Sequence, residues 1–239
     1  MNIIKNKFKI IKSRYSKLEG ISKIAILADC GCVSEWENTF PAFLDKIWHK
    51  HKPELLFIVG DLVLTGRYSE YKQLLQYLEK YPAIFIAVPC NHDRPLIYFD
   101  RYFGSCSKVI DIGKWRFICL NTANKKFSWI QQLMLQKRIR ENTVILSHVP
   151  PKFGEWEFYS LPHGSTKYFL DALNKNRQNI KSAFFGHLHG YSEQVYESVK
   201  MIVTGGCARS KAIYNNRYNE ETPLEMIIFD VESGDIKVE

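Results

Sequence analysis

Two histidines one residue apart follow a short apolar stretch late in the chain. Residues 184–186, Phe-Phe-Gly, lead into His187 and His189. Neutral imidazole is the commonest side-chain metal ligand in proteins. An apolar stretch that ends in two such side chains predicts a strand that presents a metal site, or two adjacent sites, at its tip.

Four other places repeat this arrangement, in which an apolar run stops and a polar side chain follows. The polar residues there are Asp29, Asp61, the group Asn91, His92 and Asp93, and His148. In α/β sheets, ligands bind at the carboxyl ends of strands. A single residue such as Asp29 is equally well explained as a turn or capping residue. Five such positions together favour one shared site.

The types of these side chains indicate which metals they suit. Carboxylate and amide oxygens mixed with imidazoles favour manganese, iron or zinc over calcium or a structural zinc held by cysteines. The candidate ligands are too many for one catalytic ion with an open position; they are Asp29, Asp61, Asn91, His148, His187 and His189. We therefore expect two ions that share a carboxylate.

The elements that must position these residues alternate between short apolar runs and segments of helical spacing. Predicted strands cover residues 24–28, 55–59, 84–88, 109–112, 115–120, 144–146, 182–185, 195–196, 201–204, 226–229 and 236–238, and predicted helices cover residues 35–51, 69–80, 127–139 and 165–174. Continuous apolar strands between helices indicate a sheet that helices cover. We expect an α/β fold with one domain over residues 21–239.

The amino-terminal residues 1–20 form a basic arm in this interpretation. Residues 1–23 hold seven lysines and arginines against one acid, so they carry +6 of the net charge of +8. The nearly neutral remainder gives no support for a nucleic-acid groove. Apolar residues spaced four and three apart, from Ile4 to Leu18, predict an amphipathic helix. Such a helix contacts a membrane surface or a partner protein, or folds against its own domain.

Length and composition restrict the class of protein. The chain has 239 residues, which is enough for one large domain with a sizeable core. No apolar run approaches the roughly 20 residues that span a bilayer, and no secretory signal is evident. The six cysteines show no paired framework. We therefore expect a cytoplasmic protein.

The order of the polar motifs resembles that of the calcineurin-like metallophosphoesterases. The motifs are Asp29, Gly60-Asp61, Asn91-His92-Asp93, His148 and Gly186-His187-Leu188-His189, and the resemblance covers residues 23–205. The segment from residue 60 to residue 93 is most similar to the class III cyclic-nucleotide phosphodiesterase branch. The resemblance implies a four-layer α/β/β/α sandwich and a metal-dependent phosphoesterase that hydrolyses a small phosphodiester or phosphomonoester.

The resemblance also implies roles for the motif residues. Asp61 would bridge two metals, which Asn91, His148 and His187 would bind on one side and Asp29 and His189 on the other. His92 would protonate the leaving alkoxide or donate to the phosphoryl oxygens, and Asp93 would orient it. Two ions about 3.5–4 Å apart can clamp a phosphate and activate a water for in-line attack.

Two positions depart from the family pattern. Gly31 stands where the family has a histidine, so a water or the Cys32 thiolate would have to complete that metal site. Cys90 replaces the glycine that usually begins the third motif. A second hypothesis is therefore a metal-depleted domain that binds phosphate or a partner without turnover. His163, in a loop after His148, either contacts substrate or is a surface histidine, and the oligomeric state stays open.

Overall fold

A computed structural model describes residues 8–31, 36–207 and 224–239. The elements in chain order are β1 (Lys9–Ile10), β2 (Tyr15–Leu18), β3 (Lys23–Leu27), α1 (Trp36–His51), β4 (Leu55–Val59), α2 (Tyr68–Leu78), β5 (Ile84–Val88), α3 (Leu96–Phe103), β6 (Lys108–Ile112), β7 (Trp115–Leu120), α4 (Trp129–Arg138), β8 (Thr143–Ser147), α5 (His163–Lys175), the 3₁₀ turn η1 (Arg177–Asn179), β9 (Ile180–Phe185), β10 (Ser192–Tyr196), β11 (Val199–Val203), β12 (Ile227–Asp230) and β13 (Ile236–Val238).

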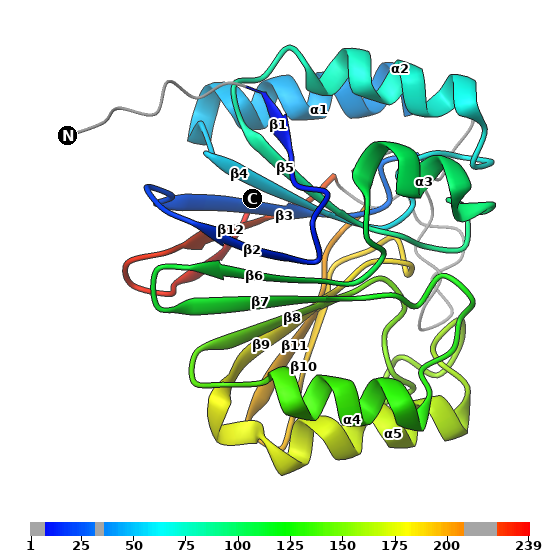
Figure 1. Cartoon of the computed structure of the whole chain (residues 1–239), viewed down its shortest axis with the longest axis vertical. Helices are drawn as coiled ribbons and strands as arrows, with labels where there is room; N and C mark the ends of the chain where they lie inside the picture. Colours follow the sequence, from blue (N-terminus) through cyan, green and yellow to red (C-terminus); the bar gives the residue numbers. More distant parts are fainter. Residues whose placement is uncertain (1–7, 32–35, 208–223) are drawn as a thin grey trace.

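The strands form two sheets that lie between two layers of helices (Figure 1). One sheet has the order β1-β5-β4-β3-β12-β13, and the other has the order β10-β11-β9-β8-β7-β6-β2. Helices α1 and α2 cover the outer face of the first sheet, while α4 and α5 cover the outer face of the second. The predicted four-layer α/β/β/α sandwich is therefore confirmed.

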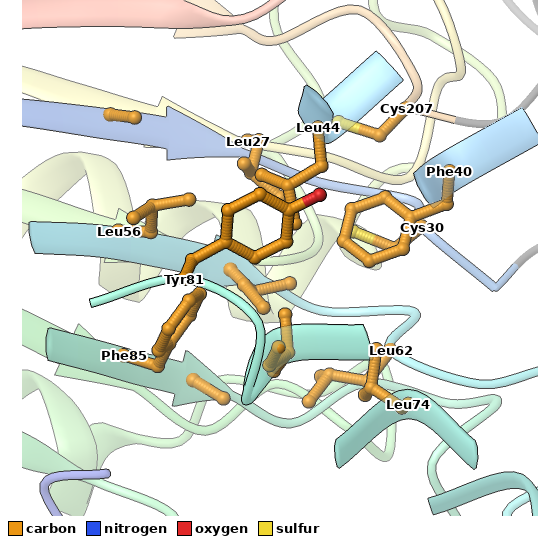
Figure 2. Packing of buried hydrophobic residues seen from close by; sticks show 14 of the residues in the cluster. Leu27, Cys30, Phe40, Leu44, Leu56, Leu62, Leu74, Tyr81, Phe85 and Cys207 are labelled. Atoms are coloured by element: carbon orange, nitrogen blue, oxygen red, sulfur yellow. The ribbon is translucent and has the colours of Figure 1, made fainter. Parts of the chain in front are cut away.

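Strand β4 shows why the central strands are apolar without interruption. Side chains alternate between the two faces of a strand. Leu56 and Ile58 pack under the helices of the first sheet, whereas Leu55 and Phe57 pack between the two sheets. Figure 2 shows the helix side of this arrangement, where Leu56 lies in one cluster with side chains from α1 and α2. Both faces of the strand are buried, so each of its positions favours an apolar residue.

The amino-terminal segment does not form the predicted helix in the part that the structure describes. Strand β1 pairs in parallel with β5, and β2 pairs in parallel with β6 of the other sheet. The Lys9 and Ile11 amides donate to the carbonyls of Ala83 and Phe85, both at 3.0 Å. Sheet pairing satisfies these backbone groups and buries Ile11, which outweighs the helical spacing. Residues 9–18 thus belong to the sandwich and are not a separate arm.

The remaining elements lie close to their predicted positions, with α3 as the one helix the sequence interpretation missed within the described residues. Helix α3 has only eight residues, and Pro95 at its N-cap provides no side-chain cap. A helix this short gives a weak periodic signal. No helix among the described residues is long and apolar enough to cross a membrane.

Candidate metal centre

The polar motifs follow strands whose carboxyl ends point the same way. Strands β3, β4 and β5 run parallel in one sheet, and β8 and β9 run parallel in the other. Asp29 and Asp61 follow the first two of these strands, and His148 and His187 follow the last two. The structure brings these side chains together across the two sheets, although they are up to 158 residues apart in the chain.

The side chains form two groups that share Asp61. One group contains Asp61, His148 and His187, and the other contains Asp29, Asp61 and His189. Within each group, one potential ligand atom from every residue lies within 4.8 Å of the others. Asp29, Asp61, His148 and His187 are buried, and His189 is half-buried. These groups contain the Asp and His ligands of the two sets that the family resemblance implies; Asn91, the remaining expected ligand, is not a member of either group.

Backbone strain is concentrated at this site. Asp29, Asp61, His187 and His189 all have positive φ angles, of 58°, 48°, 73° and 55°. Residues other than glycine rarely adopt this left-handed conformation, and each instance costs on the order of 1 kcal/mol or more. Four residues with this conformation in one cluster indicate that the fold accepts a cost in stability to hold the side chains of the candidate metal centre in place.

His148 is held in one orientation by the strand beside it. Its Nδ1 lies 2.8 Å from the Val59 carbonyl oxygen, which can only accept, so Nδ1 carries the proton. Nε2 is therefore a lone-pair donor, and it lies 3.4 Å from Asp61 Oδ1. Gly60 makes this approach possible, because a Cβ on it would lie 2.2 Å from His148 Nδ1. The hydrogen bond from His148 Nδ1 to the Val59 carbonyl is typical of histidines that bind a metal through their other ring nitrogen.

The donor atoms of this cluster fit metal ions. Among the buried side-chain atoms without a hydrogen-bond partner are Asp61 Oδ2, Asn91 Oδ1, His148 Nε2 and His187 Nε2. Buried polar atoms are normally paired, and leaving one unpaired costs about 1–3 kcal/mol. All four atoms belong to residues that follow strands, and all four can act as metal ligands. Bound cations would provide the partners that these atoms lack.

Burial sets the protonation states of these groups. It raises the pKa of Asp29 well above its ordinary value, and the neighbouring Asp61 carboxylate adds to this effect. Burial likewise lowers the pKa of His148, and it lowers that of His187 further. Neutral imidazoles are the form that binds metals. Two buried carboxylates next to each other are unfavourable without a compensating positive charge.

The packing around Gly31 excludes the histidine that the family has at this position. The Gly31 amide donates to the Asp61 carbonyl at 2.7 Å, and a Cβ at this position would lie 2.3 Å from Val63 Cα. Cys30 is buried among side chains that include Phe40, as Figure 2 shows. The chain at Gly31 therefore has no space for a side chain. Cys32, the alternative ligand suggested by the sequence, lies outside the described residues.

His92 is oriented by a backbone carbonyl, which corrects the expectation that Asp93 orients it. His92 Nδ1 lies 2.8 Å from the Leu64 carbonyl oxygen. The buried Asp93 carboxylate instead accepts from the Leu62 amide at 3.2 Å and from the Tyr71 hydroxyl at 3.1 Å. The sequence motif places the two residues side by side, but it cannot show which carbonyl lies across the loop.

Asp93 also stabilises the turn after β5. It accepts from the Cys90 amide at 2.9 Å, and burial together with the Asp61 charge raises the pKa of Asp93 to about 7. The Cys90 thiol donates to Asp61, and Cys90 is not among the residues with positive φ. Cys90 therefore replaces the family's glycine without backbone strain and contacts the shared carboxylate, a contact the sequence did not suggest.

A pocket of about 350 Å³ lies beside the His92 turn. Its lining residues are Arg94, Pro95, Leu96, Asn121, Ala123 and Asn124. The Thr122 hydroxyl accepts from the Val149 amide at 3.1 Å, which attaches this second loop to the residue after His148. His163 begins α5 and is exposed, and no described hydrogen bond or ion pair joins it to the ligand groups.

Comparison with known proteins agrees with this geometry. The family model for calcineurin-like phosphoesterases matches residues 22–191. The chain belongs to this family. As a calcineurin-like phosphoesterase, it is a hydrolase that acts on phosphoester bonds, and the family implies divalent metal ions.

Curated relatives and a solved structure share parts of this family's fold. A probable cyclic nucleotide phosphodiesterase of Vesicomyosocius okutanii is 26% identical over 174 residues, which cover 68% of this chain and 72% of the relative. Another from Synechococcus is 24% identical over 59% of each chain. A dimetal phosphatase from Danio rerio matches 91% of this chain and 98% of its own length, with a TM-score of 0.64 at 12% identity. The sequence resemblance to the class III branch is thus confirmed.

Proposed function

We propose that this phosphoesterase hydrolyses a small phosphodiester at a two-metal site, with a 3′,5′-cyclic nucleotide as the first candidate. The observation that carries the proposal is the pair of ligand groups that share Asp61, each with its atoms within 4.8 Å. The curated relatives described as probable cyclic nucleotide phosphodiesterases support the substrate class. A phosphomonoester is the alternative substrate at the same site.

The ligand assignment follows the two groups. His148 and His187, together with Asn91, would hold one ion beside Asp61, and Asp29 and His189 would complete the other side. Manganese, iron and zinc all accept such a mixture of imidazole and oxygen ligands. Two bound divalent ions supply the positive charge that neutralises phosphoryl oxygens and lowers the pKa of an attacking water.

His92 is the proposed proton donor to the leaving group. Its Nδ1 proton is engaged by the Leu64 carbonyl, so Nε2 is the nitrogen that can face a substrate. A protonated His92 can give its Nε2 proton to the leaving alkoxide and so avoid release of a strongly basic anion. The half-buried position of the ring leaves it accessible to a substrate.

The pocket beside His92 is the proposed site for the rest of the substrate. Arg94 and Asn124 are exposed and offer hydrogen-bond donors, and the volume of about 350 Å³ is in the range of small-molecule pockets. Lys125, next in the loop, lies near enough that its charge contributes to lowering the pKa of both His148 and His187. A phosphodiester that enters here meets positive charge on the pocket side.

Metal reconstitution tests the proposal directly. The full chain is treated with chelator, reloaded with Mn²⁺, and assayed with bis-p-nitrophenyl phosphate, p-nitrophenyl phosphate and 3′,5′-cyclic AMP while bound metal is measured. We expect turnover that depends on metal and a loss of both metal and turnover in His148→Ala. His163→Ala is the matched control, because His163 is exposed at the start of α5.

The outcomes separate the two functional hypotheses. Two metals with no hydrolysis of any of the three substrates would contradict the enzyme mechanism proposed here. One metal per chain with negligible hydrolysis would instead favour a non-catalytic phosphate- or partner-binding domain. The packing of Gly31 against Val63, which excludes a histidine, is the observation that keeps this second candidate open.

His92→Gln tests the proton-donor role separately from metal binding. The variant should keep its metal and lose about 10²- to 10⁴-fold in kcat on cyclic AMP, whose leaving alkoxide needs a proton. Bis-p-nitrophenyl phosphate releases a stable phenolate, so its turnover should fall much less. Equal losses on both substrates would argue against proton donation by His92.

A further inference from the structure

Helix α4 presents apolar side chains to solvent on its outer face. Trp129, Ile130 and Leu133 are 55%, 52% and 46% exposed, whereas Leu135 on the inner face is buried against the second sheet. Figure 1 shows that α4 lies in the outermost layer of the sandwich, on the side opposite α1 and α2. Three large apolar side chains close together on one helix are more than the scattered exposure that soluble surfaces usually show.

The charged residues in the stretch of chain that contains α4 are all positive. No aspartate or glutamate occurs between Lys125 and Arg140. Lys137 follows Ile130 and Leu133 at helical spacing on the same face, and Lys126 lies just before the Ser128 N-cap. Both lysines are exposed, and neither takes part in an ion pair among the described parts of the chain.

The two other cations at this end of the helix have partners within the protein. The Arg138 guanidinium lies 6.0 Å from the centre of the Tyr15 ring, and Arg140 contacts Asp111 at 3.1 Å. Lys126 and Lys137 are exposed and have no ion-pair partner among the described residues, and they lie near opposite ends of the apolar side chains.

We infer that this α4 face, made of Lys126, Trp129, Ile130, Leu133 and Lys137, docks on an anionic lipid surface. Tryptophan and aliphatic side chains enter the headgroup boundary, while flanking lysines pair with anionic headgroups. A second copy of the chain is a poorer partner, because its α4 face would bring the same positive charges. Three apolar side chains and two lysines predict weak and reversible binding.

Vesicle binding by the full chain tests the inference. Sedimentation with phosphatidylcholine vesicles that contain about 30% phosphatidylserine should show binding at low salt, and pure phosphatidylcholine should show little. A lysine near an anionic surface contributes a factor of about five in binding. The double variant Lys126→Gln, Lys137→Gln should therefore bind about 30-fold more weakly, and Trp129→Ser with Leu133→Ser should abolish binding.

A matched control uses exposed residues of the opposite layer. Ile97 of α3 is 69% exposed and Lys72 of α2 is exposed, so Ile97→Ser with Lys72→Gln removes the same kinds of side chain. This variant should bind vesicles like the parent. Thermal unfolding and turnover of bis-p-nitrophenyl phosphate verify that every variant is folded, since none of these residues lies in the metal centre.

Three results would overturn the inference. The first is no binding of the folded parent to anionic vesicles at low salt. The second is vesicle binding that the α4 variants leave unchanged or that the control variant also loses. The third is a dimer in solution that Trp129→Ser with Leu133→Ser dissociates, with no vesicle binding by the parent, which would identify the face as a protein interface.

Discussion

Restoring the family's missing histidine should damage this protein and not improve it. A Cβ at Gly31 would lie 2.3 Å from Val63 Cα and 2.6 Å from Val63 N, and the obstacle is main chain. Carbon atoms in contact normally lie about 3.5–4.0 Å apart, so the two loops must separate by about 1 Å or more. The Gly31 amide is bonded to the Asp61 carbonyl, so this movement would displace the shared ligand.

The expected size of the effect follows from the cost of overpacking. Extra atoms in a packed interior usually cost about 1–3 kcal/mol, and an obstacle made of backbone places Gly31→His near the upper end, at about 3 kcal/mol. For a chain of this length, each kcal/mol lowers the melting temperature by about 2–4 °C. We therefore expect Gly31→His to melt about 6–12 °C below the parent.

Thermal unfolding in chelator and Mn²⁺ titration together measure this outcome. Gly31→Ala separates the steric effect from the imidazole and should account for most of the loss. Gly164→Ala is the matched control: its added Cβ meets no atom within 4 Å, and alanine favours the helix it occupies. Parent-like stability of Gly31→His, combined with tighter Mn²⁺ binding, would refute the steric argument.

The other predictions concern charges and the pocket. Because burial raises the pKa of Asp29, the contribution of Asp29 to metal-free stability is fully present below its ordinary pKa of about 3.9 and is lost as pH rises through the raised value. The melting temperature of the chelated parent should therefore fall relative to that of Asp29→Asn as pH rises from the ordinary pKa of an aspartate through the raised pKa of Asp29, and parallel curves would contradict this. Arg116 lowers the pKa of Asp111 through a bidentate contact, at 2.8 and 2.9 Å. Asp111→Asn should cost about 1 kcal/mol in urea unfolding at neutral pH, and the difference should vanish as pH falls through the lowered pKa, where the parent also loses the contact. Arg94→Ala should raise the KM for the diester about tenfold with little change in kcat, since a charged hydrogen bond contributes about 1.5–3 kcal/mol; an unchanged KM would remove Arg94 from the substrate site.

The position of the candidate ligands after strands could be predicted from the sequence, because this pattern involves only residues that are close together in the chain. A buried strand followed by Asp61 or His148 is visible in consecutive residues, and parallel strands bring such ends to one edge. The pairing of His92 with the Leu64 carbonyl was not predictable, because any residue in a loop offers the same carbonyl. The same holds for Gly31, since its steric restriction arises from a neighbouring loop.

The amino-terminal error has a different physical origin. The apolar positions Phe8, Ile11, Tyr15 and Leu18 fit a helix, but in the structure Phe8 and Ile11 flank β1, and Tyr15 and Leu18 lie in β2. Spacing alone cannot distinguish the two, because what decides is whether a sheet edge is available for pairing. The free edges of β5 and β6 provide it, and neither edge can be recognised from residues 1–20.

The position of residues 9–18 affects how the protein can be shortened. The matched family region begins at residue 22, so a chain trimmed to that boundary would lose both β1 and β2. Each sheet would then expose an outer strand, β5 in one and β6 in the other, with unpaired amides and carbonyls. Exposed strand edges recruit other chains and promote aggregation. Residues 9–18 thus cover two separate sheet edges, and a protein that lacks them should be prone to self-association.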